Sequence, residues 1–187
     1  HRQEAGAGQK FPFARMRQFP ARIIRRMQYQ EGAYFQKGVG AFFFAKKEDF
    51  MTLETWFQAH PNAAAACSGG TDSAFLLWAA KEYGCNVRAY YVKTAFQPRF
   101  EYEDALRLTE ELGVPMTVVE ADILAAPGVA ENGPERCYFC KRELFTRLRE
   151  AARADGYTLL LDGTNASDDA GDRPGMRALE ELEVRSP

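Results

Sequence analysis

The chain has 187 residues, of which 46% are hydrophobic and 27% charged, and its formal net charge is −2. This composition is typical of a globular protein that can bury a core. No apolar run approaches the roughly 18 residues of a membrane-spanning helix, and no secretory signal pattern follows the basic N-terminal residues. We therefore expect a cytoplasmic protein with no membrane segment.

Charge is distributed unevenly along the chain. Residues 1–50 contain ten Lys or Arg and four acidic residues, a charge of +6, which leaves −8 for residues 51–187. We interpret residues 1–50 as a basic extension of unknown role and residues 51–187 as the globular domain. The extension could be an arm that touches nucleic acid or a segment whose charges are simply solvated. The −8 domain would repel phosphate backbones, so we expect no nucleic-acid partner.

The predicted elements alternate between strands and helices. Within the extension, residues 20–30 favour a helix and residues 40–45 a strand. The globular part predicts strands at 62–67, 86–95, 114–122 and 157–165, and helices at 73–84, 100–113 and 136–156. This alternation indicates an α/β fold, a parallel sheet with helices on both faces, in which ligands bind at the carboxyl ends of the strands. The turns at those ends are therefore the informative ones.

The first such turn is glycine-rich and consists of Ser68, Gly69, Gly70, Thr71, Asp72 and Ser73. Adjacent glycines permit a close backbone approach, and successive amides at the start of a helix suit a phosphate, with the hydroxyls of the turn as further donors. Asp72 is consistent with an accompanying Mg²⁺. The alternative is a glycine-rich cap on an ordinary helix. The pattern is neither a Walker motif nor a dinucleotide fingerprint. It resembles the PP-loop of the ATP pyrophosphatases, which implies ATP, Mg²⁺ and a Rossmann-like adenine nucleotide alpha hydrolase fold.

Two of the four cysteines form a C-x-x-C pair at the start of a predicted helix. Cys137 and Cys140 lie beside Arg136 and Lys141, and a helix N-terminus with nearby cations lowers thiol pKa. The pair is therefore a candidate nucleophile or metal-ligand site. The other two, Cys67 and Cys85, are not spaced as a second metal-binding pair, and we expect them to be buried.

The last strand is followed by a polar segment with acidic and basic residues. Acidic and amide groups directly after the strand could bind Mg²⁺ or a ribose, although such a loop is also typical of a simple turn. Arginines further on could hold an anionic acceptor. These candidates are Asp162, Gly163, Thr164, Asn165, Asp168, Asp169, Arg173, Arg177 and Arg185.

Together the stretches "SGGTDS", "RCYFCK", "DGTNASDD", "RPGMRA" and "VRSP", in this order between Met51 and Pro187, resemble the LarE family of ATP-dependent sacrificial sulfur transferases. The resemblance implies that the enzyme adenylates a carboxylate of pyridinium-3,5-biscarboxylic acid mononucleotide, releases pyrophosphate and forms a thiocarboxylate. This is a step towards the nickel-pincer nucleotide cofactor of lactate racemase. It also implies a homo-oligomer for the full-length enzyme. Relative to that family, the chain lacks a C-terminal region that carries a further cysteine.

The resemblance also implies roles for individual residues. Asp72 would assist catalysis through Mg²⁺. Cys137 and Cys140 would relay sulfur or hold a [4Fe-4S] cluster, and the presence of a cysteine pair favours the cluster-containing type of the family. Arg177 and Arg185 would hold the anionic substrate. ATP would be bound by Ser68, Gly69, Gly70, Thr71, Asp72, Ser73, Thr94, Gly163, Thr164 and Asn165.

Other functions use the same glycine-rich loop. A tRNA thiolation enzyme would explain the basic extension, and an amide-forming synthetase would leave the cysteine pair without a role. A non-enzymatic nucleotide sensor would need neither Asp72 nor the cysteines. The series of motifs after the loop favours the sulfur transferase.

Overall fold

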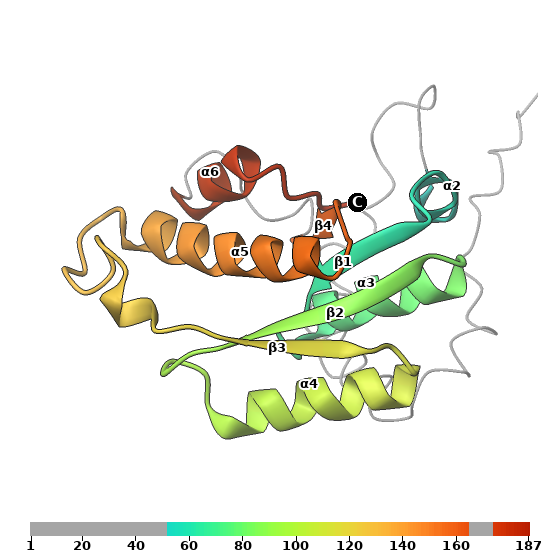
Figure 1. Cartoon of the computed structure of the whole chain (residues 1–187), viewed down its shortest axis with the longest axis horizontal. Coiled ribbons are helices and arrows are strands. Elements are labelled where there is room, and N and C mark those ends of the chain that lie inside the picture. Colours follow the sequence, from blue (N-terminus) through green and yellow to red (C-terminus); the bar gives the residue numbers. More distant parts are fainter. Residues whose placement is uncertain (1–51, 165–173) are drawn as a thin grey trace, which may run out of the picture. The chain divides into compact units, whose positions relative to one another are not determined.

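The computed structural model describes residues 52–164 and 174–187 (Figure 1). The basic extension, its predicted helix and strand, and residues 165–173 with Asn165, Asp168, Asp169 and Arg173 lie outside this part of the chain. The described elements are α2 (Leu53–Ala59), β1 (Asn62–Ala66), α3 (Thr71–Glu82), β2 (Asn86–Lys93), α4 (Arg99–Leu112), β3 (Met116–Glu120), the 3-10 helix η3 (Ile123–Ala125), α5 (Arg136–Ala154), β4 (Leu160–Leu161) and α6 (Pro174–Glu181).

The four strands form one parallel sheet in the order β3-β2-β1-β4. Ala65 of β1 is paired with Ala89 of β2 on one side and with Leu161 of β4 on the other, and Ala89 is paired with Met116 of β3. The chain first adds strands on one side of β1 and then returns to its other side. The strand order thus reverses between the neighbouring strands β1 and β4, and in open α/β sheets ligands bind outside the carboxyl ends of the strands at such a point.

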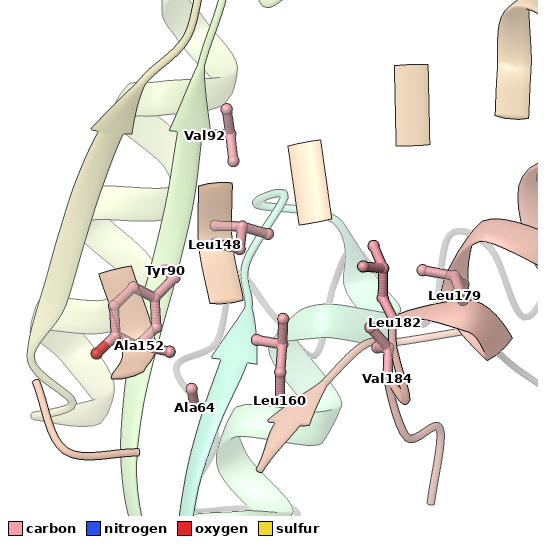
Figure 2. Close-up of a cluster of buried hydrophobic side chains, with 9 residues drawn as sticks. All are labelled: Ala64, Tyr90, Val92, Leu148, Ala152, Leu160, Leu179, Leu182 and Val184. Carbon is pink, nitrogen blue, oxygen red and sulfur yellow. The ribbon is translucent and has the colours of Figure 1, made fainter. Parts of the chain in front are cut away.

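Helices cover both faces of the sheet, as the sequence predicts. Side chains alternate between the faces of a strand, so Tyr90 and Val92 lie on one face while Tyr91 lies on the other. On the first face a buried cluster joins the sheet to α5 and α6 (Figure 2). Its members are Ala64, Tyr90, Val92, Leu148, Ala152, Leu160, Leu179, Leu182 and Val184. On the second face the sheet contacts α3 and α4 (Figure 1). The predicted fold class is confirmed.

The central strand β1 consists almost entirely of alanine, a residue that prefers helices in isolation. Ala63, Ala64 and Ala65 are completely buried between the two helical layers. Small side chains on both faces let the helices approach the middle of the sheet closely, so tertiary packing overrides the local preference.

The structure differs from the sequence prediction in some elements. The strand expected over 157–165 is regular only at Leu160–Leu161, and two helices were not predicted, α2 before the first strand and α6 after the last. Cys67 and Cys85 are buried, as expected. No helix in the described ranges combines the length and apolar character needed to cross a membrane.

Candidate functional site

The glycine-rich turn joins β1 to α3 at the carboxyl edge of the sheet. Gly69 has a φ of +75°, a left-handed conformation that favours glycine. A Cβ at this position would lie 2.9 Å from the carbonyl oxygen of Glu101 and 3.3 Å from the amide nitrogen of Ala105, both in α4. Backbone conformation and the contact with α4 therefore both require glycine here. Gly70 is the N-cap of α3, and no side chain caps the helix there.

Hydrogen bonds within the turn hold its shape. The Ser73 hydroxyl donates to the carbonyl of Gly70 at 3.0 Å and accepts from the amide of Ser68 at 3.3 Å. The amide of Gly70 donates to the Ser68 hydroxyl at 3.3 Å. Ser73 is buried, whereas Ser68 and Asp72 are exposed and Thr71 is partly exposed. The side chain of Ser73 thus braces the turn from inside.

The turn after β4 lies directly against this loop. A Cβ on Gly163 would lie 2.9 Å from the amide nitrogen of Ser73 and 3.0 Å from the carbonyl carbon of Asp72. The structure therefore brings two of the predicted nucleotide-binding stretches into backbone contact at the reversal point of the sheet. The N-terminus of α3, the positive end of its dipole, thus lies at the contact between the two turns, and a helix N-terminus of this kind suits an anion.

A buried carboxylate holds the turn after β4 in place. Asp162 accepts hydrogen bonds from the hydroxyl of Thr164 at 2.5 Å and from the hydroxyl of Ser186. The amide of Asp162 donates to the carbonyl of Arg185, and the amide of Arg185 donates to the carbonyl of Leu160, both at 3.0 Å. The "VRSP" segment is thereby attached to β4. Sequence reasoning treated Asp162 as a candidate metal or ribose ligand and gave Ser186 no role.

The turn after β2 is closed by its own side chains. Gln97 accepts hydrogen bonds from the amide of Thr94 at 2.9 Å and from its hydroxyl at 2.5 Å. The Thr94 hydroxyl in turn accepts from the amide of Phe96 at 3.1 Å. Thr94 therefore shapes the loop that was expected to border the nucleotide.

The cysteine pair lies at the same edge of the sheet. Asp155, just after α5, accepts hydrogen bonds from Tyr90 at 2.8 Å and from Thr117 at 3.3 Å, so α5 ends beside β2 and β3. Its first turn lies at the other end of the helix, towards the loop that follows β2 (Figure 1). There the guanidinium of Arg136 lies 5.4 Å from the ring centre of Phe96.

The two thiols have different environments. Cys137 is exposed and Cys140 is half-buried. Burial raises the pKa of Cys140, and the charge of Arg136 opposes this only in part. The expectation of a lowered thiol pKa is therefore wrong for Cys140, because the second position of the motif faces inward. Burial also raises the pKa of Cys67.

The two candidate arginines differ in what they contact. Arg177 in α6 is paired with Glu135, the N-cap of α5, and with Glu181 at 3.8 Å, and it lies 4.1 Å from the ring centre of Tyr138. The Tyr138 hydroxyl donates to Glu181 at 2.6 Å. Through these contacts Arg177 links α6 to the turn that carries the cysteines. Arg185 is exposed, and it forms no ion pair with any residue of the described ranges.

The donor groups fit Mg²⁺ and a nucleotide better than an iron–sulfur cluster. Mg²⁺ commonly uses one or two carboxylates together with substrate phosphates, and Asp72 supplies one carboxylate in the first turn of α3. A [4Fe-4S] cluster is held by several thiolates. Within residues 52–164 and 174–187, no three His, Cys, Asp or Glu side chains gather as a metal site. The cysteine pair by itself does not complete a cluster site.

Comparison with known proteins identifies relatives in sequence. No protein-family model matches the chain. An uncharacterized protein of Synechocystis is 36% identical over 72% of this chain and 51% of its own length. A protein of Lactiplantibacillus plantarum named pyridinium-3,5-bisthiocarboxylic acid mononucleotide synthase is 32% identical over 65% of this chain and 45% of its own length. The chain thus spans about half the length of the curated relatives it matches.

Solved structures share the fold. The NH3-dependent NAD synthetase of Campylobacter jejuni superposes with a TM-score of 0.51 at 20% identity, covering 62% of this chain and 55% of that one. An NMN synthetase of Francisella tularensis gives a TM-score of 0.51 at 19% identity over 63% of this chain and 56% of that one. At this identity the likeness concerns the arrangement of strands and helices.

Proposed function

Because this chain is a homologue of the LarE enzyme and has the fold of the PP-loop ATP pyrophosphatases, we propose that it is an ATP-dependent sulfur transferase. The proposed reaction activates a carboxylate of pyridinium-3,5-biscarboxylic acid mononucleotide with ATP and replaces one of its oxygens by sulfur. The product belongs to the synthesis of the nickel-pincer nucleotide of lactate racemase. The name of the plantarum relative supports this choice of acceptor.

The observation that carries the proposal is the contact between Gly163 and the backbone of Asp72 and Ser73. It joins the turn after β4 to the glycine-rich turn after β1, where the order of strands reverses. The glycine-rich turn would receive the phosphates of ATP at the N-terminus of α3, beside the positive end of the helix dipole. The turns at Thr94 and at Gly163–Thr164 would border the adenosine.

Adenylation follows from this placement. A carboxylate oxygen of the acceptor attacks the α-phosphorus of ATP, the bond from that phosphorus to the bridging oxygen breaks, and pyrophosphate leaves. Negative charge develops on the leaving pyrophosphate. Donors of the glycine-rich turn would stabilise this charge in the transition state, because they are already oriented before the reaction. Asp72 would hold a Mg²⁺ ion there, which neutralises phosphate charge.

Sulfur transfer would occur at the start of α5. A sulfur nucleophile attacks the activated acyl carbon, and the AMP oxygen leaves in place of a much poorer leaving group. Cys137 is the exposed thiol of the pair, which suits contact with the acyl group, whereas Cys140 lies half-buried behind it. Where the nucleophile is the sulfur of a cysteine, loss of that residue's α-proton then breaks its Cβ–S bond, which releases the thiocarboxylate and leaves dehydroalanine in the protein. Where the nucleophile is a sulfide held by the pair, the thiocarboxylate forms directly as AMP leaves.

The test is to incubate the protein anaerobically with Mg-ATP and the biscarboxylic mononucleotide, and to identify the products by mass spectrometry. The expected result is pyrophosphate together with an adenylated acceptor. An Asp72→Asn variant should bind ATP but release little pyrophosphate. If wild-type protein that binds ATP releases pyrophosphate only with ammonia or with tRNA, the acceptor proposed here is wrong.

A further inference from the structure

Phe96 is a large apolar side chain that is exposed to solvent. It is 46% exposed, and it lies in the turn between β2 and α4, at the edge of the sheet where ligands bind. The hydrogen bonds from Thr94 to Gln97, and from Phe96 to Thr94, fix the backbone on either side of the ring. The ring is therefore held towards solvent by a braced loop.

A cation lies over this ring. The Arg136 guanidinium, 5.4 Å from the ring centre of Phe96, is within the usual range for a cation–π contact. Arg136 forms no ion pair within the described part of the chain, in contrast to Arg177, which is paired with Glu135 and Glu181. Its charge also reaches the thiol of Cys140. An aromatic face and a guanidinium that has no carboxylate partner among the described residues thus lie together beside the cysteine turn.

We propose that Phe96 and Arg136 form the binding platform for the aromatic ring of the acceptor, an inference that rests on the function proposed above. The acceptor ring is a pyridinium, which is both flat and cationic, and it carries carboxylates. A phenylalanine face attracts a flat cation. A guanidinium pairs with a carboxylate through two parallel hydrogen bonds. The two side chains therefore match the two chemical features of the ring.

The platform also explains how the acceptor would be oriented. Arg136 directly precedes Cys137 in the first turn of α5. A carboxylate held by Arg136 would lie at the cysteine end of the site, and the ring on Phe96 would fix the plane of that carboxylate. Orientation of this kind brings the acyl carbon and the sulfur together before reaction.

The test compares Phe96→Leu with Phe96→Tyr, and uses Phe100→Leu as the matched control. Phe100 is a 59% exposed phenylalanine in the first turn of α4, and no cation of the described residues lies over its ring. Acceptor-dependent pyrophosphate release is measured while the concentrations of acceptor and of ATP are varied separately. Stacking on an aromatic side chain contributes enough to change affinity by roughly tenfold or more.

We expect Phe96→Leu to raise KM for the acceptor about tenfold and to leave KM for ATP within twofold of wild type. Phe96→Tyr should restore the acceptor KM, and Phe100→Leu should leave both values unchanged. Arg136→Lys, which keeps the charge but loses the paired hydrogen bonds, should also raise only the acceptor KM. Equal acceptor KM values for Phe96→Leu and Phe100→Leu, with an active wild type, would overturn the platform alone. A wild type without acceptor-dependent release would overturn the proposed function and the platform with it.

Discussion

Gly163, in the turn after β4, and Ser73, at the start of α3, are in backbone contact, with no space between them for a methyl group. Two turns that are far apart in the sequence therefore lie in direct contact. The contact depends on the absence of a side chain at Gly163, and it sets the distance between the glycine-rich turn, which we expect to bind phosphate, and the turn expected to border the adenosine.

Replacing Gly163 by alanine should weaken ATP binding. The added methyl group would push the turn after β4 away from α3, and overpacking of this kind costs about 1–3 kcal/mol. We expect the dissociation constant for ATP, measured by calorimetry, to rise by roughly tenfold. Gly133→Ala is the control, because a Cβ on Gly133 has no neighbour within 4 Å. Unchanged ATP affinity in a folded Gly163→Ala protein would contradict the proposed cradle.

The four cysteines should react with alkylating agents in a definite order. Cys137 is exposed and should react first, Cys140 more slowly, and Cys67 and Cys85 only after unfolding. Because the thiolate is the reactive form, the raised pKa of Cys140 should move the midpoint of its reaction above the pH at which an ordinary cysteine titrates. Labelling with iodoacetamide between pH 7 and 10, followed by peptide mass spectrometry, measures this. A midpoint for Cys140 below the ordinary value would refute it.

The buried thiol of Cys67 should make stability fall in alkaline solution. Its pKa is raised by burial, so the folded protein retains a proton that the unfolded chain loses. The contribution of the Cys67 thiol to the free energy of unfolding is complete below the pKa of the unfolded thiol. It is lost as the pH rises towards the higher pKa of the thiol in the folded protein. We expect Cys67→Ala to show a weaker decline in melting temperature than wild type above about pH 8.5. Parallel declines for both proteins would count against this assignment.

Arg177 and Arg185 should respond differently to removal. Arg177 connects α6 to the cysteine turn through Glu135 and Tyr138, so Arg177→Ala should lower the melting temperature and alter the alkylation rate of Cys137. Arg185→Ala should leave the melting temperature unchanged and raise KM for the anionic acceptor, because its backbone, not its side chain, is bonded to β4. If the two variants have the same thermal stability, the connecting role of Arg177 is wrong.

The core beneath α5 should be sensitive to truncation. Leu148 is 3% exposed and packs in the cluster between α5 and the sheet (Figure 2). Leu148→Ala should lower the free energy of unfolding by about 2–5 kcal/mol. Leu124→Ala, at a 47% exposed position, should change it by no more than about 0.5 kcal/mol. Urea denaturation followed by circular dichroism distinguishes these values, and a similar loss in both variants would contradict the packing described.

Local pattern was enough to predict most of the fold. The apolar runs correctly predict the strands. The glycine after the second helical pattern correctly predicts the end of α4, since Gly113 adopts the left-handed conformation that ends a helix. The glycine-rich turn was recognisable because its residue types are those that a phosphate requires. Pairing of β4 with β1 could be expected only from the fold class, because nothing in the sequence "YTLLLDGTN" specifies a neighbour.

Side-chain environments were less predictable. The inward orientation of Cys140 depends on how α5 packs on the sheet, and the ion pairs of Arg177 depend on where α6 lies. Neither is visible from spacing along the chain. The sequence does not distinguish the exposed Phe96 from a buried phenylalanine such as Phe57, since the exposure of Phe96 follows from the turn closed by Gln97.

The position of β4 has a consequence for how the protein forms. Ala64 of β1 pairs with Leu160 of β4, so these two neighbouring strands come from widely separated parts of the described sequence. Contacts of such long separation are slow to form, because the entropy of closing a large loop must be overcome first. A chain that has not yet added β4 lacks the turn at Gly163 and hence half of the nucleotide cradle. We therefore expect ATP to bind only the completed sheet, and by mass action to act as a late stabiliser of the whole fold.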